Sequence, residues 1–397
     1  MMQFPRLRFL LAGAAFAGLA SPAFALDGVD FVTKLNAAYA TNGATLAYET
    51  VDVNDDSVVL KGASVRSTVK TTDELKIGDL SFDGVEELSD GGYTVETVAF
   101  PDIDRTADGA RLTAKDIAIS GLRVPAKTGT GSIDDLLYYQ SAGTGPITVE
   151  IGGKTVFAID KLESNLTRQD GDKGIDFDGI VSGVKADLSD VKDAKTKMAI
   201  DKLGLQNPTG EFTMEGSWDL ASGVFAVRDN SINVDNVGRL SVGFNVSGYT
   251  LQLLNSLQEA FKAAEANPNK EAANQALGLS AMGLIQQLNF NSASIRFEDA
   301  SITKRLLDYF GAEQGVTGEQ MAQSIKGLAP IMIAQLNLPD LQNQLTAAIT
   351  AYLDAPKNLT ITAEPAKPVP FPMIMGAGMG APNTLPSVLG VKVTAND

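Results

Sequence analysis

The chain has 397 residues, a formal net charge of −16 and neither histidine nor cysteine. The negative charge disfavours nucleic acid and bare anionic lipid surfaces as partners, because both repel an acidic protein. The lack of histidine and cysteine excludes Ser-His-Asp and Cys-His catalysis, zinc or haem bound through histidine, imidazole pH switches and disulfide bonds. These exclusions favour a binding or structural protein over an enzyme.

Residues 1–25 have the composition of a cleaved secretory signal peptide. Arg6 and Arg8 form a basic start, residues 9–20 are mostly apolar, and Ala23-Phe24-Ala25 has the small-residue pattern of a cleavage site. The apolar run is too short to span a bilayer, and no later run reaches the roughly 18 apolar residues that a membrane helix needs. We therefore expect a periplasmic protein with no transmembrane segment in its mature chain.

The mature chain begins with a predicted helix and continues into a β-rich region. Within residues 26–44, apolar side chains recur at helical spacing at Val29, Val32, Leu35 and Tyr39. Residues 45–250 alternate between apolar and polar in short runs, which turn clusters rich in Asp and Gly separate. This pattern is typical of many short strands.

Residues 251–397 form a helix-rich region with interspersed strands, which we expect to join the same sheet. Helices are predicted over 251–266, 271–288, 302–310, 317–325, 329–336 and 339–353, and strands over 289–301, 357–363 and 390–395.

One spacing of apolar residues recurs along the chain. Two apolar residues with one residue between them are followed, after a small or charged pair, by a second such couple. The copies are Val58-Leu60-Ala63-Val65, Leu75-Ile77-Leu80-Phe82, Leu112-Ala114-Ile117-Ile119, Met198-Ile200-Leu203-Leu205 and Ile295-Phe297-Ala300-Ile302, with a weaker one at Phe157-Ile159-Leu162.

The three-residue step in the middle of each copy would place the second couple on the opposite face of a regular strand. Either a β-bulge or a two-residue hairpin turn would restore a common face. The bulge is favoured, because pairs such as Lys115-Asp116 are poor residues for the positive φ that a tight hairpin turn needs. The sequence thus predicts an α+β, mostly β protein. Its centre is a curved antiparallel sheet of repeated bulged strands, with the helix-rich C-terminal part packed on it.

Such strands would give the sheet one continuous apolar face. This face is either a core covered by the C-terminal helices or, in part, an open groove for acyl chains or an apolar peptide. Residues assigned to the face as candidate ligand contacts are Leu75, Ile77, Leu80, Phe82, Leu112, Ile117, Ile119, Met198, Ile200 and Leu203.

Other candidate sites are few. Met373, Met375 and Met379 lie in an apolar segment that could form a mobile lid, a membrane-touching turn or a short helix docked on a core. The carboxylates from Asp170 to Asp176 alternate as in a calcium loop, but the distal Glu of an EF-hand is missing, so a hairpin turn is favoured. We expect no catalytic residue, metal or cofactor.

Three segments resemble AsmA-like and DUF945 (YdgA-like) proteins of Gram-negative cell envelopes. They are the Leu112–Leu122 unit, the strand around Trp218, and the run from Ser294 to Ile302 that leads into a helix. The resemblance covers about half the chain and implies a curved β-sheet, no enzymatic activity and a role in outer-membrane or lipid homeostasis. The chain departs from AsmA-like proteins in its shorter length and its cleavable signal in place of a membrane anchor.

These observations lead to two functional hypotheses. The first is a non-enzymatic periplasmic protein that binds or shields an apolar ligand, a lipid or an acyl chain, in envelope maintenance. The alternative is a structural or interaction protein of the envelope whose apolar face is filled by its own helices. A lipid or another envelope protein is therefore the expected partner, and nucleic acid is not.

Overall fold

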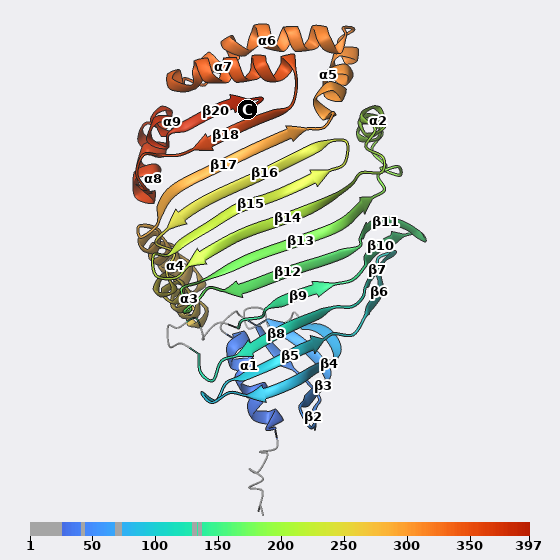
Figure 1. Cartoon of the computed structure of the whole chain (residues 1–397), viewed down its shortest axis with the longest axis vertical. Coiled ribbons are helices and arrows are strands. Elements are labelled where there is room, and N and C mark those ends of the chain that lie inside the picture. The colour runs from blue at the N-terminus through green and yellow to red at the C-terminus, as the bar shows by residue number, and fades with distance from the viewer. Residues whose placement is uncertain (1–25, 41–43, 68–73, 129–132, 134–136) are drawn as a thin grey trace, which may run out of the picture.

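The fold is dominated by one open antiparallel sheet, to which the described residues contribute twenty strands. The computed structural model describes residues 26–40, 44–67, 74–128, 133 and 137–397, so the predicted signal peptide lies outside the described residues. Figure 1 shows the strands stacked along the long axis of the molecule, with the N-terminal helix at one end and two long helices at the other. The predicted fold class is confirmed.

Most strands pair with their neighbours in the chain, although several long strands are divided in two. The strands are β1 (Ala44–Ala47), β2 (Thr50–Asn54), β3 (Ser57–Ser67), β4 (Glu74–Glu87), β5 (Tyr93–Ala99), β6 (Ile103–Ala107), β7 (Ala110–Ala114), β8 (Ala118–Val124), β9 (Ser141–Thr144), β10 (Ile147–Ile151), β11 (Lys154–Ile159), β12 (Lys161–Arg168), β13 (Gly174–Ala186), β14 (Thr209–Asp219), β15 (Val224–Val234), β16 (Gly238–Ser247), β17 (Asn289–Asp299), β18 (Asn358–Ala363), β19 (Val369–Pro370) and β20 (Val391–Ala395).

The N-terminal helix packs against the first strands, and the other helices lie at the two ends of the strands and beyond the last strand, β20 (Figure 1). The helices are α1 (Gly28–Ala40), α2 (Ala194–Leu203), α3 (Leu251–Ala266), α4 (Lys270–Ile285), α5 (Ile302–Glu313), α6 (Gly318–Gln335), α7 (Pro339–Asp354), α8 (Phe371–Gly380) and α9 (Leu385–Val388). The two predicted helices over 317–325 and 329–336 are one helix, α6, which continues through Pro330. Within the described part of the chain, no helix is long and apolar enough to cross a bilayer.

The repeated apolar spacing corresponds to bulges and bends in the strands. Between β3 and β4 the register shifts after Leu60, and Gly62 and Gly78 have positive φ there, so the predicted bulge is confirmed in these two copies. In the Leu112 copy, Asp116 has a positive φ, and the chain bends between β7 and β8. The pairing continues across that bend, because the Gly145 N–H donates to the Lys115 carbonyl at 2.9 Å.

One copy was predicted wrongly as a strand, and in another the strand and the helix that follows it are present as predicted, so that only its first two apolar residues lie in a strand. Residues 198–203 belong to the helix α2, which Asp193 caps by accepting a hydrogen bond from the Thr196 N–H at 2.8 Å and which ends at Gly204 with φ 66°. In the Ile295 copy, β17 ends at Asp299, whose carboxylate accepts from the Thr303 N–H at 2.8 Å in the first turn of α5. In both places the capping residues, which favour a helix locally, outweigh the apolar spacing.

The tightest core of the described residues lies where the first strands curl around α1. Phe31 is fully buried, and its ring meets those of Phe82 and Tyr93 edge to face, with centroids 5.2 and 5.4 Å away. Asp27 starts the helix by accepting hydrogen bonds from the backbone N–H groups of Val29 and Asp30, both at 3.0 Å. The predicted helix is therefore present and buries Val32 and Leu35 as expected, but Val29 is exposed and Phe31 points inward in its place.

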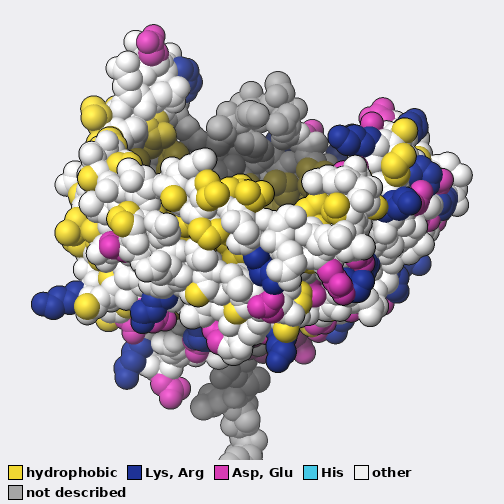
Figure 2. All heavy atoms as spheres, turned by 90° about the horizontal axis from the view of Figure 1, so that it is seen from above, with side chains coloured by type: hydrophobic (Ala, Val, Ile, Leu, Met, Phe, Trp, Pro, Cys, Tyr) yellow, Lys and Arg dark blue, Asp and Glu magenta, His cyan; other side chains and the backbone are white. Residues whose placement is uncertain are grey.

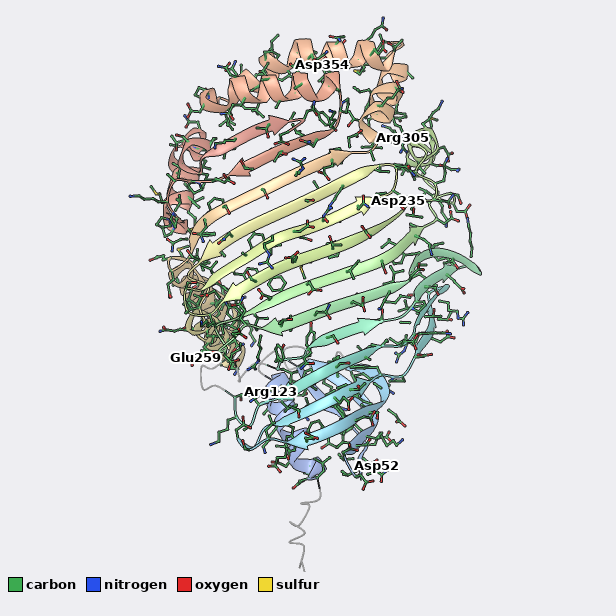
Figure 3. The ribbon with its side chains drawn as sticks, in the orientation of Figure 1. Asp52, Arg123, Asp235, Glu259, Arg305 and Asp354 are labelled. Carbon is green, nitrogen blue, oxygen red and sulfur yellow. The ribbon has the colours of Figure 1, made fainter. Side chains whose placement is uncertain are left out.

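The far edge of the sheet is covered by α7, which packs along β20. The outward N–H of Val393 donates to the Gln344 side chain of α7 at 3.2 Å, and the Lys326 ammonium of α6 pairs with Asp354 of α7 at 2.6 Å. At the strand ends, Arg305 of α5 donates to the Leu203 carbonyl of α2 at 2.8 Å (Figure 3). These contacts fix the helices to the rim of the sheet.

Replacing Phe31 by alanine tests the core around α1. We expect Phe31→Ala to lower the free energy of unfolding by about 3–5 kcal/mol, because it removes a buried ring and leaves a cavity. Val29→Ala, on the exposed side of the same helix, should change it by less than about 0.5 kcal/mol. Urea denaturation measures both, and a loss for Phe31→Ala as small as the control's would contradict the described core.

The carboxylate of Asp30 links α1 to Tyr93 and gives a pH dependence. Hydrogen bonds from Lys34 and from the Tyr93 hydroxyl, the latter at 2.6 Å, lower the pKa of Asp30. Because the folded state favours the ionised carboxylate, its contribution to stability is complete above the unfolded pKa of about 3.9 and is lost as the pH falls through the lower folded pKa. The stability difference between the natural chain and Asp30→Asn should therefore shrink as the pH is lowered through 4. Urea titrations of both chains at a series of pH values measure it, and a constant difference would contradict the linkage.

Candidate functional site

Strand register places apolar side chains from seven neighbouring strands on one side of the sheet. Residues directly opposite each other in an antiparallel ladder share a face. One row of such partners runs through Val181, Phe212, Ile232, Leu240, Phe297 and Leu359. We call the following set the apolar face: Leu162, Leu166, Ile175, Phe177, Val181, Phe212, Met214, Trp218, Phe225, Val227, Ile232, Leu240, Val242, Phe244, Phe290, Ile295, Phe297, Leu359 and Ile361.

The opposite side of the same strands is polar. The neighbouring row runs through Thr213, Ser231, Ser241, Arg296, Thr360 and Thr394. Thr213 and Ser231 share a hydrogen bond of 2.8 Å, and Arg296 donates to Thr360 at 2.8 Å. Such a polar side can face water, whereas the apolar face needs either a cover or a ligand.

The apolar face is left open along β14 to β18. Ile232 keeps 53% of its surface exposed, Ile295 keeps 47% and Leu240 keeps 42%, whereas Leu60 under α1 keeps none. In Figure 1 the helices α3 and α4 lie at one end of these strands, and α2 and α5 lie at the other. Figure 2 shows a hollow bordered by hydrophobic side chains on one side of the molecule and many charged side chains on the opposite side.

The apolar face lies on the same side of the sheet as the surface that α1 covers. Val98 of β5 lies opposite Ile119 of β8, and Ile119 lies opposite Ala142 of β9. Ala142 in turn lies opposite Ser164, and Ser164 lies opposite Gly179 of β13. One surface therefore runs from the α1 core, across a strip of small residues, onto the apolar face.

Aromatic rings gather at the α3 end of the apolar face. The rings of Phe177 and Phe225 stack with centroids 5.5 Å apart, Phe244 lies 5.9 Å from Phe225, and Tyr249 lies 5.5 Å from Trp218. The Trp218 indole N–H donates to the Tyr249 carbonyl at 2.7 Å, so its polar atom is satisfied. Below these rings, a Cβ at Gly216 would come within 2.3 Å of the Phe177 ring.

A side chain at position 216 should disturb this aromatic cluster. We expect Gly216→Ala to lower the free energy of unfolding by about 1–3 kcal/mol, because the added carbon displaces Phe177 or the backbone of β15. Gly278→Ala in α4, where a Cβ meets no atom within 4 Å, is the matched control and should not destabilise the protein. Chemical denaturation followed by the fluorescence of the single tryptophan measures both. Equal stability of the two variants would contradict the packing.

The predicted ligand contacts do not all lie together. Leu80 and Phe82 are buried under α1, Ile77 and Ile119 pack against that core, and Leu75 is exposed. Leu112 and Ile117 lie on either side of the bend between β7 and β8. These residues belong to the N-terminal half of the sheet, where α1 provides part of the cover.

The remaining predicted contacts lie outside the sheet. Met198, Ile200 and Leu203 sit on α2 at the ends of the strands, so their assignment to the face of a strand is wrong. Met373, Met375 and Met379 sit on α8, a helix in which no residue is buried. Among the alternatives that the sequence left open for this segment, a helix is observed, and a role as a lid stays a prediction.

The sequence reasoning missed most of the open face. Phe212, Phe225 and Phe244 lie in plain alternation within 209–247, a signal that was present but lacked the bulged spacing. Ile295 and Phe297 belong to a recognised copy but were not assigned as ligand contacts. Ile361 follows the same alternation in β18.

A wide depression of about 1280 Å³ on the polar side, between the N-terminal curl and β12, is lined by residues such as Glu96, Arg123 and Asp178. In the described part of the chain, no group of three or more acidic residues is placed to hold a metal ion. Asp170 and Asp172 lie in the hairpin turn between β12 and β13, and Asp176 lies in β13, where it accepts a hydrogen bond from Gln169 at 3.0 Å.

Comparison with known proteins gives one family match. A family described as "Uncharacterized protein" matches residues 231–396, which run from the middle of β15 to the residue after β20. No curated protein matches the chain. The matched segment contains the members of the apolar face from Ile232 to Ile361, together with α3 to α9.

Proposed function

We propose that this protein is a non-enzymatic periplasmic protein whose apolar face binds the acyl chains of a lipid in envelope maintenance. The observation that carries the proposal is the half-exposed state of Ile232, Leu240, Ile295 and Ile361 on neighbouring strands. A contiguous apolar surface of this kind is unusual on a monomer unless it contacts something apolar.

The shape and chemistry of the face suit an acyl chain better than a polar or compact ligand. Its side chains come from many strands in register, so the surface is long in the direction that crosses the strands. The opposite, polar side keeps the molecule soluble without any cover over the apolar face. Each CH₂ group that leaves water for such a surface contributes about 0.8 kcal/mol, so a long chain can bind without specific polar contacts.

Native lipid content tests the proposal directly. The mature chain, purified from its own host and extracted with organic solvent, should yield lipid in stoichiometric amounts by mass spectrometry. After delipidation it should take up a fluorescent fatty acid. A clean extract together with no uptake would contradict the proposal and favour an envelope interaction protein with no ligand.

Paired substitutions locate the binding surface. Leu240→Asp with Ile361→Asp puts two carboxylates on the apolar face, whereas Ser241→Asp with Thr362→Asp puts them on the polar side of the same strands. We expect the first pair to weaken fatty-acid binding about tenfold or more, because a carboxylate under an acyl chain loses its hydration, and tenfold corresponds to only about 1.4 kcal/mol. The second pair should bind like the natural chain, and equal binding by both pairs would place the ligand elsewhere.

A further inference from the structure

A second exposed apolar surface lies on α6, beyond the last strand of the sheet. Leu328 keeps 55% of its surface exposed, Ile331 keeps 61%, Met332 keeps 64% and Leu336, at the end of the helix, keeps 59%. We call these four residues, with the partly exposed Ile325, the α6 stripe. Met321, Ala329 and Ile333 of the same helix are buried, so α6 already has a buried side and the stripe is additional to it.

The α6 stripe lies in an uncharged segment of an acidic protein. Residues 327–339 contain no Asp, Glu, Lys or Arg, although the chain carries a net charge of −16. The nearest lysine, Lys326, is mostly buried and pairs with Asp354. Figure 2 looks onto this end of the molecule and shows hydrophobic side chains on it that reach the rim of the hollow.

The two ends of the sheet differ in what they present. At the N-terminal end, α1 fills the concave side with a packed core that includes Phe31 and Leu35. At the other end the apolar face runs through Leu359 and Ile361 of β18 towards β20, and α7 and then α6 follow (Figure 1). A lipid that moves across the strands along the apolar face therefore meets a packed core at the α1 end and no such core at the end that carries the α6 stripe.

We propose that the α6 stripe docks on the surface of a lipid bilayer and so brings the open end of the apolar face to the membrane. This inference rests on the proposed function, because it assigns the stripe to the exchange of the lipid bound there. The uncharged, apolar character of the stripe matches the interfacial region of a bilayer, into which Leu, Ile and Met side chains insert. Because residues 327–339 carry no Lys or Arg, the contact does not depend on anionic lipid.

A second copy of the chain fits the stripe less well. The α6 stripe runs from Ile325 to Leu336, about 18 Å along the helix, so at a width of about 10 Å it offers roughly 180 Å² to a partner. Stable protein interfaces bury about 800 Å² on each partner. A bilayer has no such requirement, because inserted side chains are surrounded by lipid on all sides.

Vesicle flotation tests the docking. The mature chain should float with phosphatidylcholine vesicles, and Ile331→Asp with Met332→Asp should reduce the floating fraction about tenfold or more, because carboxylates resist insertion among acyl chains. Gln323→Asp with Ala334→Asp adds the same charge at exposed positions of the same helix and should float like the natural chain. Equal flotation of the two variants would overturn the proposal.

Two further readouts separate this inference from the proposed function. Uptake of a fluorescent fatty acid from solution needs the apolar face but no membrane, so the Ile331→Asp and Met332→Asp variant should retain it. If the natural chain floats with vesicles but takes up no fatty acid, lipid binding at the apolar face is overturned, and with it the exchange role of the stripe. Light scattering that finds a dimer of the natural chain and a monomer of this variant would assign the stripe to a second copy and overturn membrane docking.

Discussion

Side chains in a β-strand alternate between the two faces of a sheet, and in this protein that alternation is kept in register from the α1 core to the last strands. The row from Val181 to Leu359 depends on it, as does the polar row beside it. A shift of one residue in any pairing would turn apolar side chains to the polar side. The bulges around Gly62 and Gly78 and the bend at Asp116 therefore do more than curve the sheet, because each absorbs an extra residue and returns the apolar side chains to the same face.

Alternation and spacing are local signals, and they predicted the local features well. The antiparallel sheet, its bulges and the helices from α3 to α7 follow from patterns within short segments. The failures occurred where two local signals competed. Met198 and Ile200 fit the bulged spacing, but Asp193 and Gly204 cap the same segment as a helix. In α1, apolar residues recur at helical spacing whether the count starts from Val29 or from Phe31. Only the contacts of the Phe31 ring with Phe82 and Tyr93 place Phe31, and not Val29, in the core.

The openness of the apolar face could not be predicted from the sequence. Alternation reveals which residues share a face but contains no information about what lies on that face, since this depends on contacts between distant segments. Leu60 and Leu240 stand in similar alternating runs, yet α1 covers the first and no comparable helix of the described residues covers the second. The helix-rich composition of the C-terminal region suggested a cover, but those helices lie at the ends of the strands and along the edge strand (Figure 1).

The structure protects the edge of its sheet while leaving the face open, and this difference bears on function. An unpaired edge strand pairs readily with other chains, and proteins usually block it. Here α7 lies along β20, and Gln344 accepts a hydrogen bond from the outward Val393 N–H. The same region of the chain provides α3, α4 and α6, which are long enough to cross several strands, yet these helices leave the aliphatic rows of Ile232 and Ile295 exposed. A protein that needed only stability could have buried those rows, because burial of each such side chain contributes about 1.5–3 kcal/mol. Their exposure supports the proposed lipid binding, because a covering helix would exclude a ligand that has to come and go.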